Sequence, residues 1–413
     1  MHHTVRAVNR LTARWGRTAP ADGRNTAFSA PGAWAPLALL AAGATGPAAR
    51  ELADALGVPT TGAAAAGREL LAALDRTPGV TAALGLWTRD RLPLEPAWTA
   101  ELPPHSHRRI TGDPATDRAA IDSWAAERTA GAIPRMPVAV TPDTELLLAG
   151  ALTVRTDWIR RFDSHPYEPQ AGPWQGRPVA GLHRRTGLLD RVGVAEDVGA
   201  GPLTVLKVLG LRGVDVHLCL GPEDAAPGAV LAAAVRTAER PGLLRPGPEL
   251  PDGAPGPGLT AGWVRSYSRE PELLVSTVEF DLTDDHDLLE RPDLFGLRAA
   301  ADTTRGHFPG ISTAPLAVGS ARQTTTAVFG PRGFRAASVT AFGVAAGAAA
   351  VRPPYAVRRL TADFDRPFAF LAVHRTSRLV LAAGWVADPK PYDPEADDPE
   401  WGDQEGDDPE SEW

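Results

Sequence analysis

The sequence predicts an α+β protein with a large core, and three observations support this prediction. Apolar residues make up 43% of the 413 residues, which is enough for one large domain or two of ordinary size. The first third of the chain places apolar residues at helical spacing. Later segments, such as Leu203 to Gly221, have instead the short apolar runs that are typical of buried strands.

The helical segments come first along the chain. An amphipathic helix is predicted at the N-terminus, and its apolar face carries Val5, Val8, Leu11 and Trp15. A core helix from Ala33 to Ala42 follows, and then an amphipathic helix that contains Leu52 and Leu56. Ile121 to Ile133 predicts another helix, which ends at a glycine, Gly131.

Strands and loops are predicted from Thr141 onward. Thr141 to Asp163 contains an apolar strand that should be buried on both faces and closed by Trp158 and Phe162. Gly210 to Gly213 should form a hairpin turn. The segment from Gly242 to Gly262 is rich in proline and glycine and predicts a surface loop. The polar cluster Asp284, Asp285, His286 and Asp287 predicts a capped helix start.

The single cysteine, the N-terminus and the length of the apolar runs indicate where in the cell the protein is expected. One cysteine, Cys219, cannot form an intramolecular disulfide, and it is expected to be a core residue of a strand. The N-terminus lacks the apolar region and the cleavage site of a signal peptide, so a cytoplasmic location is expected. The longest apolar run, Ala33 to Ala44, is shorter than the roughly 20 residues that span a membrane, so no membrane association is expected.

The acidic residues are concentrated at the C-terminus. Pro391 to Trp413 contains eleven Asp and Glu and no Lys or Arg, which predicts a disordered acidic tail over residues 390–413. Without these eleven charges the net charge of −8 becomes +3 for the remaining chain. That remainder has no basic stripe with interleaved aromatic residues, so nucleic acid is not expected as a partner.

No catalytic constellation is recognisable. The sequence lacks the Gly-x-Ser-x-Gly elbow, the Walker loop, the His-Glu-x-x-His motif and the Gly-x-Gly-x-x-Gly motif. His105 and His107 are followed by two arginines, which would repel a cation. We therefore expect no catalytic residues, no metal and no cofactor.

One stretch, Gln323 to Phe370, combines two kinds of pattern. It begins with a threonine-rich strand pattern and a Gly-Pro-Arg-Gly turn and continues as a long tract of small residues. Such a tract cannot anchor itself in a core, so it predicts an exposed loop. The residues from Ala336 to Val344 are nevertheless small or β-prone, so they could enter a sheet as a strand. The sequence therefore predicts a bait loop.

These residues resemble the serpin family of serine protease inhibitors, in its bacterial type. Gly333 and the small residues after it resemble the hinge of that family, and Asp365 to Pro389 resembles its Pro-Phe-x-Phe ending. Similar blocks recur in the family's order at residues 24–58, 121–133, 141–163 and 307–323. The resemblance implies a single serpin domain over residues 1–389, with three mainly antiparallel β-sheets, about eight or nine helices and a reactive loop at about 333–359.

The implied function is inhibition by conformational trapping. A serine protease of subtilisin, elastase or trypsin type attacks the loop and forms an acyl-enzyme, and the cleaved loop then inserts into a sheet and distorts the protease. The alternative is a non-inhibitory serpin-fold protein that binds or scaffolds. Either protein would be a monomer without enzymatic activity, and the family resemblance allows an extracellular location.

The hinge departs from the family pattern at its start. The residues that match the hinge are Gly333, Phe334, Arg335, Ala336, Ala337, Ser338, Val339 and Thr340. Phe334 replaces a small hydroxyl residue on the face that turns inward, so we expect overpacking of roughly 1 to 3 kcal/mol to slow insertion. Arg335 replaces a glutamate on the solvated face. Pro331 removes an N–H, which is tolerable at the end of a strand.

The sequence also departs from the family pattern where the sheet would open to admit the loop, and the position of the scissile bond is open. The positions that match the sheet-opening region are Ser29, Gly32, Gly150, Trp158 and Gln323. Glycine at two of them and glutamine at a third replace polar residues of the family, so we expect a weakened hydrogen-bonded lock. Counting from the hinge places the scissile bond at Gly347-Ala348, whereas counting back from Phe364 places it near Ala356 to Arg358.

Overall fold

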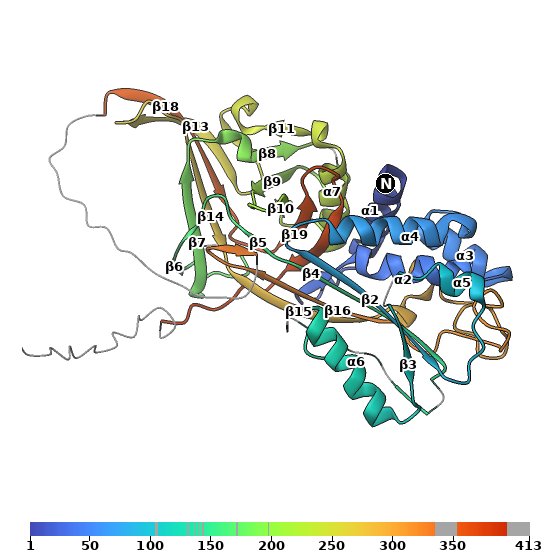
Figure 1. Cartoon of the computed structure of the whole chain (residues 1–413). Coiled ribbons are helices and arrows are strands. Elements are labelled where there is room, and N and C mark those ends of the chain that lie inside the picture. The colour runs from blue at the N-terminus through green and yellow to red at the C-terminus, as the bar shows by residue number, and fades with distance from the viewer. Residues whose placement is uncertain are drawn as a thin grey trace, which may run out of the picture.

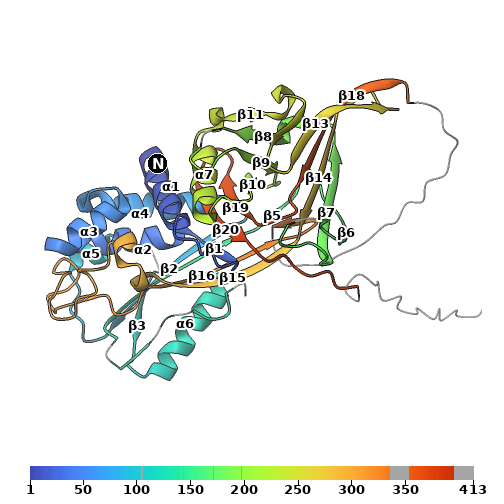
Figure 2. The same ribbon diagram turned by 180° about the vertical axis from the view of Figure 1, so that it is seen from behind.

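The computed structural model describes residues 1–334 and 353–394, apart from residues 104, 105, 130, 132, 137, 139, 143, 171 and 197. The described chain packs helices against layers of β-sheet (Figure 1). Turning the molecule by 180° shows that helices α1 to α5 gather at the end opposite strand β18 (Figure 2). No helix in the described ranges is long and apolar enough to cross a membrane.

The helices have these bounds: α1 (His2–Gly16), α2 (Ala30–Ala42), α3 (Gly46–Leu56), α4 (Thr60–Asp75), α5 (Pro96–Ala100), α6 (Pro114–Arg128), α7 (Pro227–Glu239) and α8 (Pro292–Phe295). Four short 3-10 helices accompany them: η1 (Leu189–Arg191), η2 (Pro241–Leu243), η3 (Gly247–Glu249) and η4 (Leu288–Glu290). The predicted apolar face of α1 is confirmed, because Val5, Val8, Leu11 and Trp15 are all buried.

The largest sheet has the strand order β1-β20-β19-β10-β9-β8-β11. Its strands are β1 (Thr26–Phe28), β20 (Val380–Val386), β19 (Phe368–His374), β10 (Val214–Leu220), β9 (Leu203–Val208), β8 (Val192–Ala195) and β11 (Leu244–Pro246). The predicted hairpin is confirmed, since β9 and β10 pair antiparallel on either side of Gly210 to Gly213. Cys219 is buried in β10, as expected.

A second sheet has the order β12-β13-β18-β14-β7-β6. Its strands are β12 (Gly253–Gly256), β13 (Leu259–Ser266), β18 (Tyr355–Asp363), β14 (Glu272–Val278), β7 (Val179–Thr186) and β6 (Asp163–Tyr167). The pairing is antiparallel except between β14 and β18, which run parallel.

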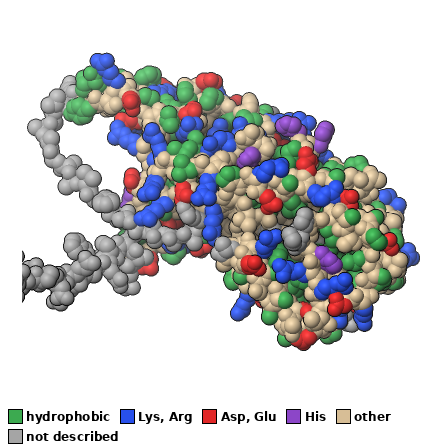
Figure 3. All heavy atoms as spheres, viewed as in Figure 1, with side chains coloured by type: hydrophobic (Ala, Val, Ile, Leu, Met, Phe, Trp, Pro, Cys, Tyr) green, Lys and Arg blue, Asp and Glu red, His purple; other side chains and the backbone are tan. Residues whose placement is uncertain are grey.

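On the face shown in the space-filling view, basic, acidic and apolar side chains are intermixed (Figure 3).

The third layer is split into two sheets. One has the order β15-β16-β17-β5 and the other has the order β3-β2-β4. Their strands are β15 (Phe280–Asp287), β16 (Arg322–Phe329), β17 (Gly333–Phe334), β5 (Thr156–Asp157), β3 (His107–Ile110), β2 (Val80–Arg89) and β4 (Leu146–Val154). Only Arg155 separates β4 from β5, so the chain itself joins the two sheets into one layer. With three such layers and the helices around them, the predicted α+β fold is confirmed.

Two local predictions were wrong. The segment from Gly242 to Gly262 is not a simple loop, because it holds β11, β12 and the start of β13. Its apolar residues are few, but Leu244, Leu250 and Leu259 are all buried and fix it to the fold. Its prolines are tolerated because β11 and β12 are edge strands.

The acidic cluster at residues 284–287 was the second error. These residues continue strand β15 and pair with the first residues of β16. Asp284 accepts hydrogen bonds from Thr26 Oγ1, at 2.6 Å, and from the Ala27 N–H. Only Asp287 caps a helix, since it accepts from the Leu289 N–H at the start of η4.

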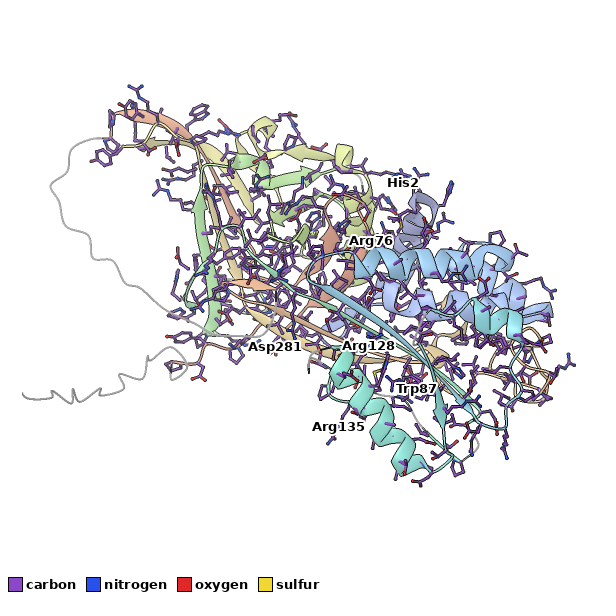
Figure 4. The ribbon with its side chains drawn as sticks, viewed as in Figure 1. His2, Arg76, Trp87, Arg128, Arg135 and Asp281 are labelled. Carbon is purple, nitrogen blue, oxygen red and sulfur yellow. The ribbon has the colours of Figure 1, made fainter. Side chains whose placement is uncertain are left out.

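A smaller core lies beneath α6. Trp87 of β2, labelled in Figure 4, meets Trp124 of α6 edge to face with 4.9 Å between the ring centroids. The helix begins at Pro114 with Asp113 as its N-cap and ends at Arg128, so it starts seven residues before the predicted bound at Ile121 and stops short of Gly131.

The described chain continues past the predicted domain end at residue 389. Lys390 accepts a hydrogen bond from the Ala180 N–H, at 3.0 Å, and donates its own N–H to Glu279. The Tyr392 N–H donates to the Pro178 carbonyl at 3.2 Å. The first residues of the predicted acidic tail therefore lie against the beginning of β7.

Candidate functional site

The candidate site begins where β16 turns back into the short strand β17. After Phe329 the chain reverses through residues 330–332, and β17 then pairs antiparallel with β16 on one side and with β5 on the other. Phe334 lies opposite Phe329 and opposite Thr156. The start of the predicted hinge is thus already a strand between the two halves of the split layer.

The turn before β17 is held by residues that follow β5. Trp158 donates its indole N–H to the Gly330 carbonyl, at 2.9 Å, and its backbone N–H to the Arg332 carbonyl, also at 2.9 Å. The Phe162 N–H donates to the Pro331 carbonyl at 2.9 Å. Pro331 is therefore tolerated because the turn uses its carbonyl and needs no donor from it.

Gly333 is required by a close approach of two backbones. A Cβ atom at Gly333 would collide with the Thr156 carbonyl oxygen, and a Cα atom of Asp157 would be only 3.1 Å away. The absence of a side chain therefore lets β17 pair closely with β5.

Phe334 is buried rather than obstructive. Its side chain is 2% exposed, and its ring centroid lies 6.2 Å from that of Phe370 in β19. Phe329, Phe280 and Trp158 extend the same aromatic cluster, with Phe280 stacked on Phe329 at 5.2 Å. The expected overpacking does not arise at this position, because the fold already provides the space for the ring.

Below β17, a group of hydrogen bonds joins β16 to the start of α2. We call this group the lock. The Gln323 side-chain amide of β16 accepts from the Ser29 N–H at 2.9 Å and donates to the Ser29 carbonyl at 2.8 Å. The Ser29 hydroxyl donates to the Leu381 carbonyl at 2.8 Å and accepts from the Gly32 N–H as the N-cap of α2. One glutamine side chain thus ties the start of α2 to β16, so the lock is present in a changed form.

The two glycines of the lock face each other. A Cβ atom at Gly150 in β4 would collide with the Gly32 carbonyl oxygen and would lie 3.2 Å from Cγ of Pro36. A side chain as large as asparagine does not fit at Gly150 unless α2 shifts. The paired glycines therefore replace a polar contact with a close approach of β4 and α2.

A small cavity of about 50 Å³ lies beside the lock. Gly32 and Pro36 of α2, Gly150 of β4 and Gln323 of β16 contribute to its wall, and most of the other lining residues are apolar. The gap between β4 and β16 is therefore incompletely filled below β17.

The remaining predicted positions fall into two groups. Trp158 lies at the β17 turn and not at the lock, so the structure divides the predicted sheet-opening set into two places. Arg335 to Thr340 and the candidate bond Gly347-Ala348 lie outside the described residues.

Ala356 and Arg358 lie within β18. Ala356 pairs with Arg265 of β13, and Arg358 pairs with Trp263. The Arg358 guanidinium also forms an ion pair with Asp252 and donates to the Leu250 carbonyl at 2.6 Å. These two residues are therefore part of a paired strand.

The middle of β18 is anchored by a buried carboxylate. Glu272 of β14 is 3% exposed and forms ion pairs with Arg359, at 2.6 Å, and with Arg185. Burial by itself would raise the pKa of Glu272, but hydrogen bonding and attraction from the two arginines lower it below its usual value. The chain that returns from the candidate loop is therefore fixed by a charged cluster.

Sequence reasoning missed two partners in this site. Thr156 supplies the backbone against which β17 pairs, and Phe370 supplies the ring beneath Phe334. Phe370 was within the recognised Pro-Phe-x-Phe ending, but nothing in the pattern indicated its contact. Among the described residues, no three His, Cys, Asp or Glu side chains come together as metal ligands would.

The comparisons agree with this architecture. A sequence model described as "Serpin (serine protease inhibitor)" matches residues 6–171. A search of curated proteins finds no match.

Three solved structures illustrate the likeness in fold. A complex of thyroxine-binding globulin with thyroxine is 16% identical, with 94% of this chain and 98% of that chain covered and a TM-score of 0.69. Native protease nexin-1 with heparin is also 16% identical, with 94% and 99% covered and a TM-score of 0.69. The thermophilic serpin tengpin in its native state is 14% identical, with 93% and 94% covered and a TM-score of 0.72.

The fold and the site define an α+β protein whose third layer is split around the short strand β17. Its fold is the serpin fold, and the resemblance of the sequence to the serpin family is confirmed.

Proposed function

We propose that this protein inhibits a serine protease by inserting its cleaved reactive loop between β16 and β4. The observation that carries the proposal is the position of β17, which already pairs with both β16 and β5. A strand that has entered the layer by two residues needs no new nucleus, so further residues can add to it one by one. Each added residue gains backbone hydrogen bonds to one or both neighbours.

The register of β17 supports a specific path for insertion. Phe334 lies opposite Thr156 and Phe329. Six residues further along the loop is Thr340, and six residues back along the two neighbouring strands are Gly150 and Gln323. In the inserted strand, Thr340 would therefore lie between the two residues of the lock.

The neighbouring strands also set a length for the insertion. Continuing the same register, the first residue of β16, Arg322, lies opposite residue 341, and the first residue of β4, Leu146, lies opposite residue 344. Residues 335–341 would be paired on both sides. The inward face would carry small side chains, Ala336, Ser338 and Thr340.

The chemistry of trapping requires a bait bond in the loop. The serine Oγ of the protease attacks the carbonyl carbon of the scissile bond, an ester forms, and the amine of the next residue leaves with a proton. Insertion then moves the ester-linked protease before water can hydrolyse it. We place this bond at Gly347-Ala348, because Ala356 and Arg358 are paired within β18 and a protease needs an extended, unpaired segment.

The lock and the cavity have distinct roles in this proposal. Gln323 holds α2 against β16 through the backbone N–H and carbonyl of Ser29, so the layer stays closed until the strand enters. The cavity of about 50 Å³ beside it is space that the inserted strand can occupy. Filling it would add apolar contacts that the intact protein lacks.

The test is an incubation with serine proteases of subtilisin, elastase and trypsin type, followed by denaturing electrophoresis. We expect a covalent complex that survives SDS, with a mass equal to the protease plus residues 1–347, because SDS releases the fragment that begins at residue 348. A protein that is only cut, or not cut, by every protease tested would contradict the proposal.

A matched pair of variants tests the insertion step. Thr340→Arg places a charge on the inward face beside Gly150, so the acyl-enzyme should hydrolyse before insertion and the protein should become a substrate. Val339→Arg places the same charge on the outward face, where it stays solvated, and should preserve the complex. Equal complex formation by both variants would contradict the proposed register.

The alternative is a non-inhibitory serpin-fold protein that binds or scaffolds. It is favoured by the tight seating of Phe334 and by the two-point hold of Gln323 on Ser29, both of which stabilise the closed layer. In that case cleavage of the loop would leave the layer closed. In either case we propose a monomer, located in the cytoplasm or outside the cell.

A further inference from the structure

A second cavity is remote from the split layer and has a different chemistry. It encloses about 690 Å³ between α1, α7 and the turn that joins β19 to β20. Helices α1 and α7 lie side by side in both ribbon views (Figures 1 and 2). His2, labelled in Figure 4, marks the N-terminal end of α1, and the whole length of this helix contributes to the cavity. Its volume lies within the roughly 300 to 1,000 Å³ that is usual for small-molecule sites.

The wall of this cavity is strongly basic. Six arginines line it, namely Arg6, Arg10, Arg17, Arg236, Arg240 and Arg378. Glu239 is the one acidic residue among the lining residues. The whole chain, in contrast, has more acidic than basic residues, with 50 Asp and Glu against 42 Lys and Arg. The concentration of positive charge is therefore local and opposite to the balance of the chain.

The positive charges are not neutralised within the described part of the protein. None of the six guanidinium groups forms an ion pair with a described residue, and Arg236 donates only to the Val198 carbonyl, at 3.2 Å. Helix α1 contains no acidic residue at all. Burial and the repulsion of Arg10 and Arg17 lower the pKa of the neighbouring Arg14. Like charges at this spacing destabilise a helix, so folding alone does not account for them.

One of the arginines is held in a strained backbone conformation. Arg378 has φ of +63°, and it is the only residue other than glycine with positive φ among the described residues. Asn9 of α1 holds this turn, because its side chain donates to the Arg378 carbonyl at 2.9 Å and accepts from the Val380 N–H at 2.9 Å. Glycine would adopt this conformation without strain, so an arginine at this position costs stability.

We propose that this cavity binds a compact organic polyphosphate, of about the size of a nucleoside triphosphate. Guanidinium groups bind phosphate oxygens through paired N–H donors, and the six arginines converge from three elements on one volume. Val5, Ala232 and Val235 give the cavity an apolar part that can contact the organic portion of the ligand. No Phe, Tyr or Trp is among the described residues that line the cavity, so it lacks the large stacking surfaces that a nucleic-acid strand would use.

The test measures binding of inorganic tripolyphosphate and of ATP to the full chain by titration calorimetry at about 0.1 M salt. We expect one ligand per chain and an affinity for orthophosphate that is lower by at least about a hundredfold. Arg6→Ser and Arg240→Ser should each weaken tripolyphosphate binding by about tenfold. Arg50→Ser, an exposed helical arginine outside the cavity, is the matched control and should change the affinity by less than about twofold.

Arg378→Gly separates a binding role from a structural one. It should weaken tripolyphosphate binding by about tenfold while leaving the melting temperature of the ligand-free protein equal or higher. Equal weakening by Arg50→Ser, several ligands per chain, or unchanged binding in all three cavity variants would overturn the proposal. Affinity that keeps rising with the length of a single-stranded oligonucleotide would also overturn it. The inference does not depend on protease inhibition, because these variants should trap a protease as the unmodified protein does.

Discussion

Gln323→Ala is the substitution with the most direct structural consequence at the lock. It removes the acceptor for the Ser29 N–H and one donor to the Ser29 carbonyl. The carbonyl keeps the N–H of Ala33 as a partner, at 3.3 Å, but the Ser29 N–H is left buried and unpaired. An unpaired buried donor costs about 1 to 3 kcal/mol, and the lost side-chain packing adds to this. We therefore expect a loss of about 2 to 4 kcal/mol in the free energy of unfolding.

The assay is chemical unfolding followed by tryptophan fluorescence. Thr326→Ala, an exposed substitution in the same strand, is the control and should shift the unfolding midpoint little. The weakened lock should also speed the conversion of the intact protein, on warming, into a form whose loop resists proteolysis. An unchanged midpoint in Gln323→Ala would refute the reasoning, because it would mean that Gln323 does not hold α2 to β16.

Three further outcomes are expected. Gly333→Val should lower the unfolding temperature by several degrees in a thermal scan, since its side chain collides with the Thr156 carbonyl; an unchanged temperature would show that β17 is not paired with β5. Burial raises the pKa of the Cys219 thiol, so a thiol-reactive dye should label it only in denaturant, and labelling of the native protein would contradict this. Deleting residues 395–413 should leave the unfolding temperature unchanged, whereas a deletion that extends through Tyr392 should lower it slightly, because the bond to Pro178 is lost.

The helices and most strands could be predicted because their signals are local. The apolar face of α1 is visible in the spacing of a few residues, and the β9–β10 hairpin is visible in its glycines. The segment after Gly242 could not be predicted in the same way. Its few leucines are far apart in the sequence, and only the surrounding strands decide that they are buried.

The positions of the lock could be predicted, but its strength could not. Family resemblance located Ser29, Gly150 and Gln323, yet the contact of Gln323 with both backbone groups of Ser29 joins residues that are 294 positions apart. The seating of Phe334 depends in the same way on Phe370, which comes from another sheet. A residue that replaces the family's usual choice can therefore be accommodated by partners that no local pattern reveals.

The measurement that tests the central claim most directly compares the unfolding temperatures of the intact protein and of the protein cleaved in the loop between residues 344 and 352. If the loop inserts, residues 335–341 gain hydrogen bonds to β16 on one side and to Arg155 and β4 on the other. At about 1 kcal/mol net for each residue added, the stabilisation is of the order of 7 kcal/mol. We therefore expect the cleaved protein to unfold at a temperature higher by about 10 °C or more. Cleaved and intact proteins that unfold at the same temperature would contradict it.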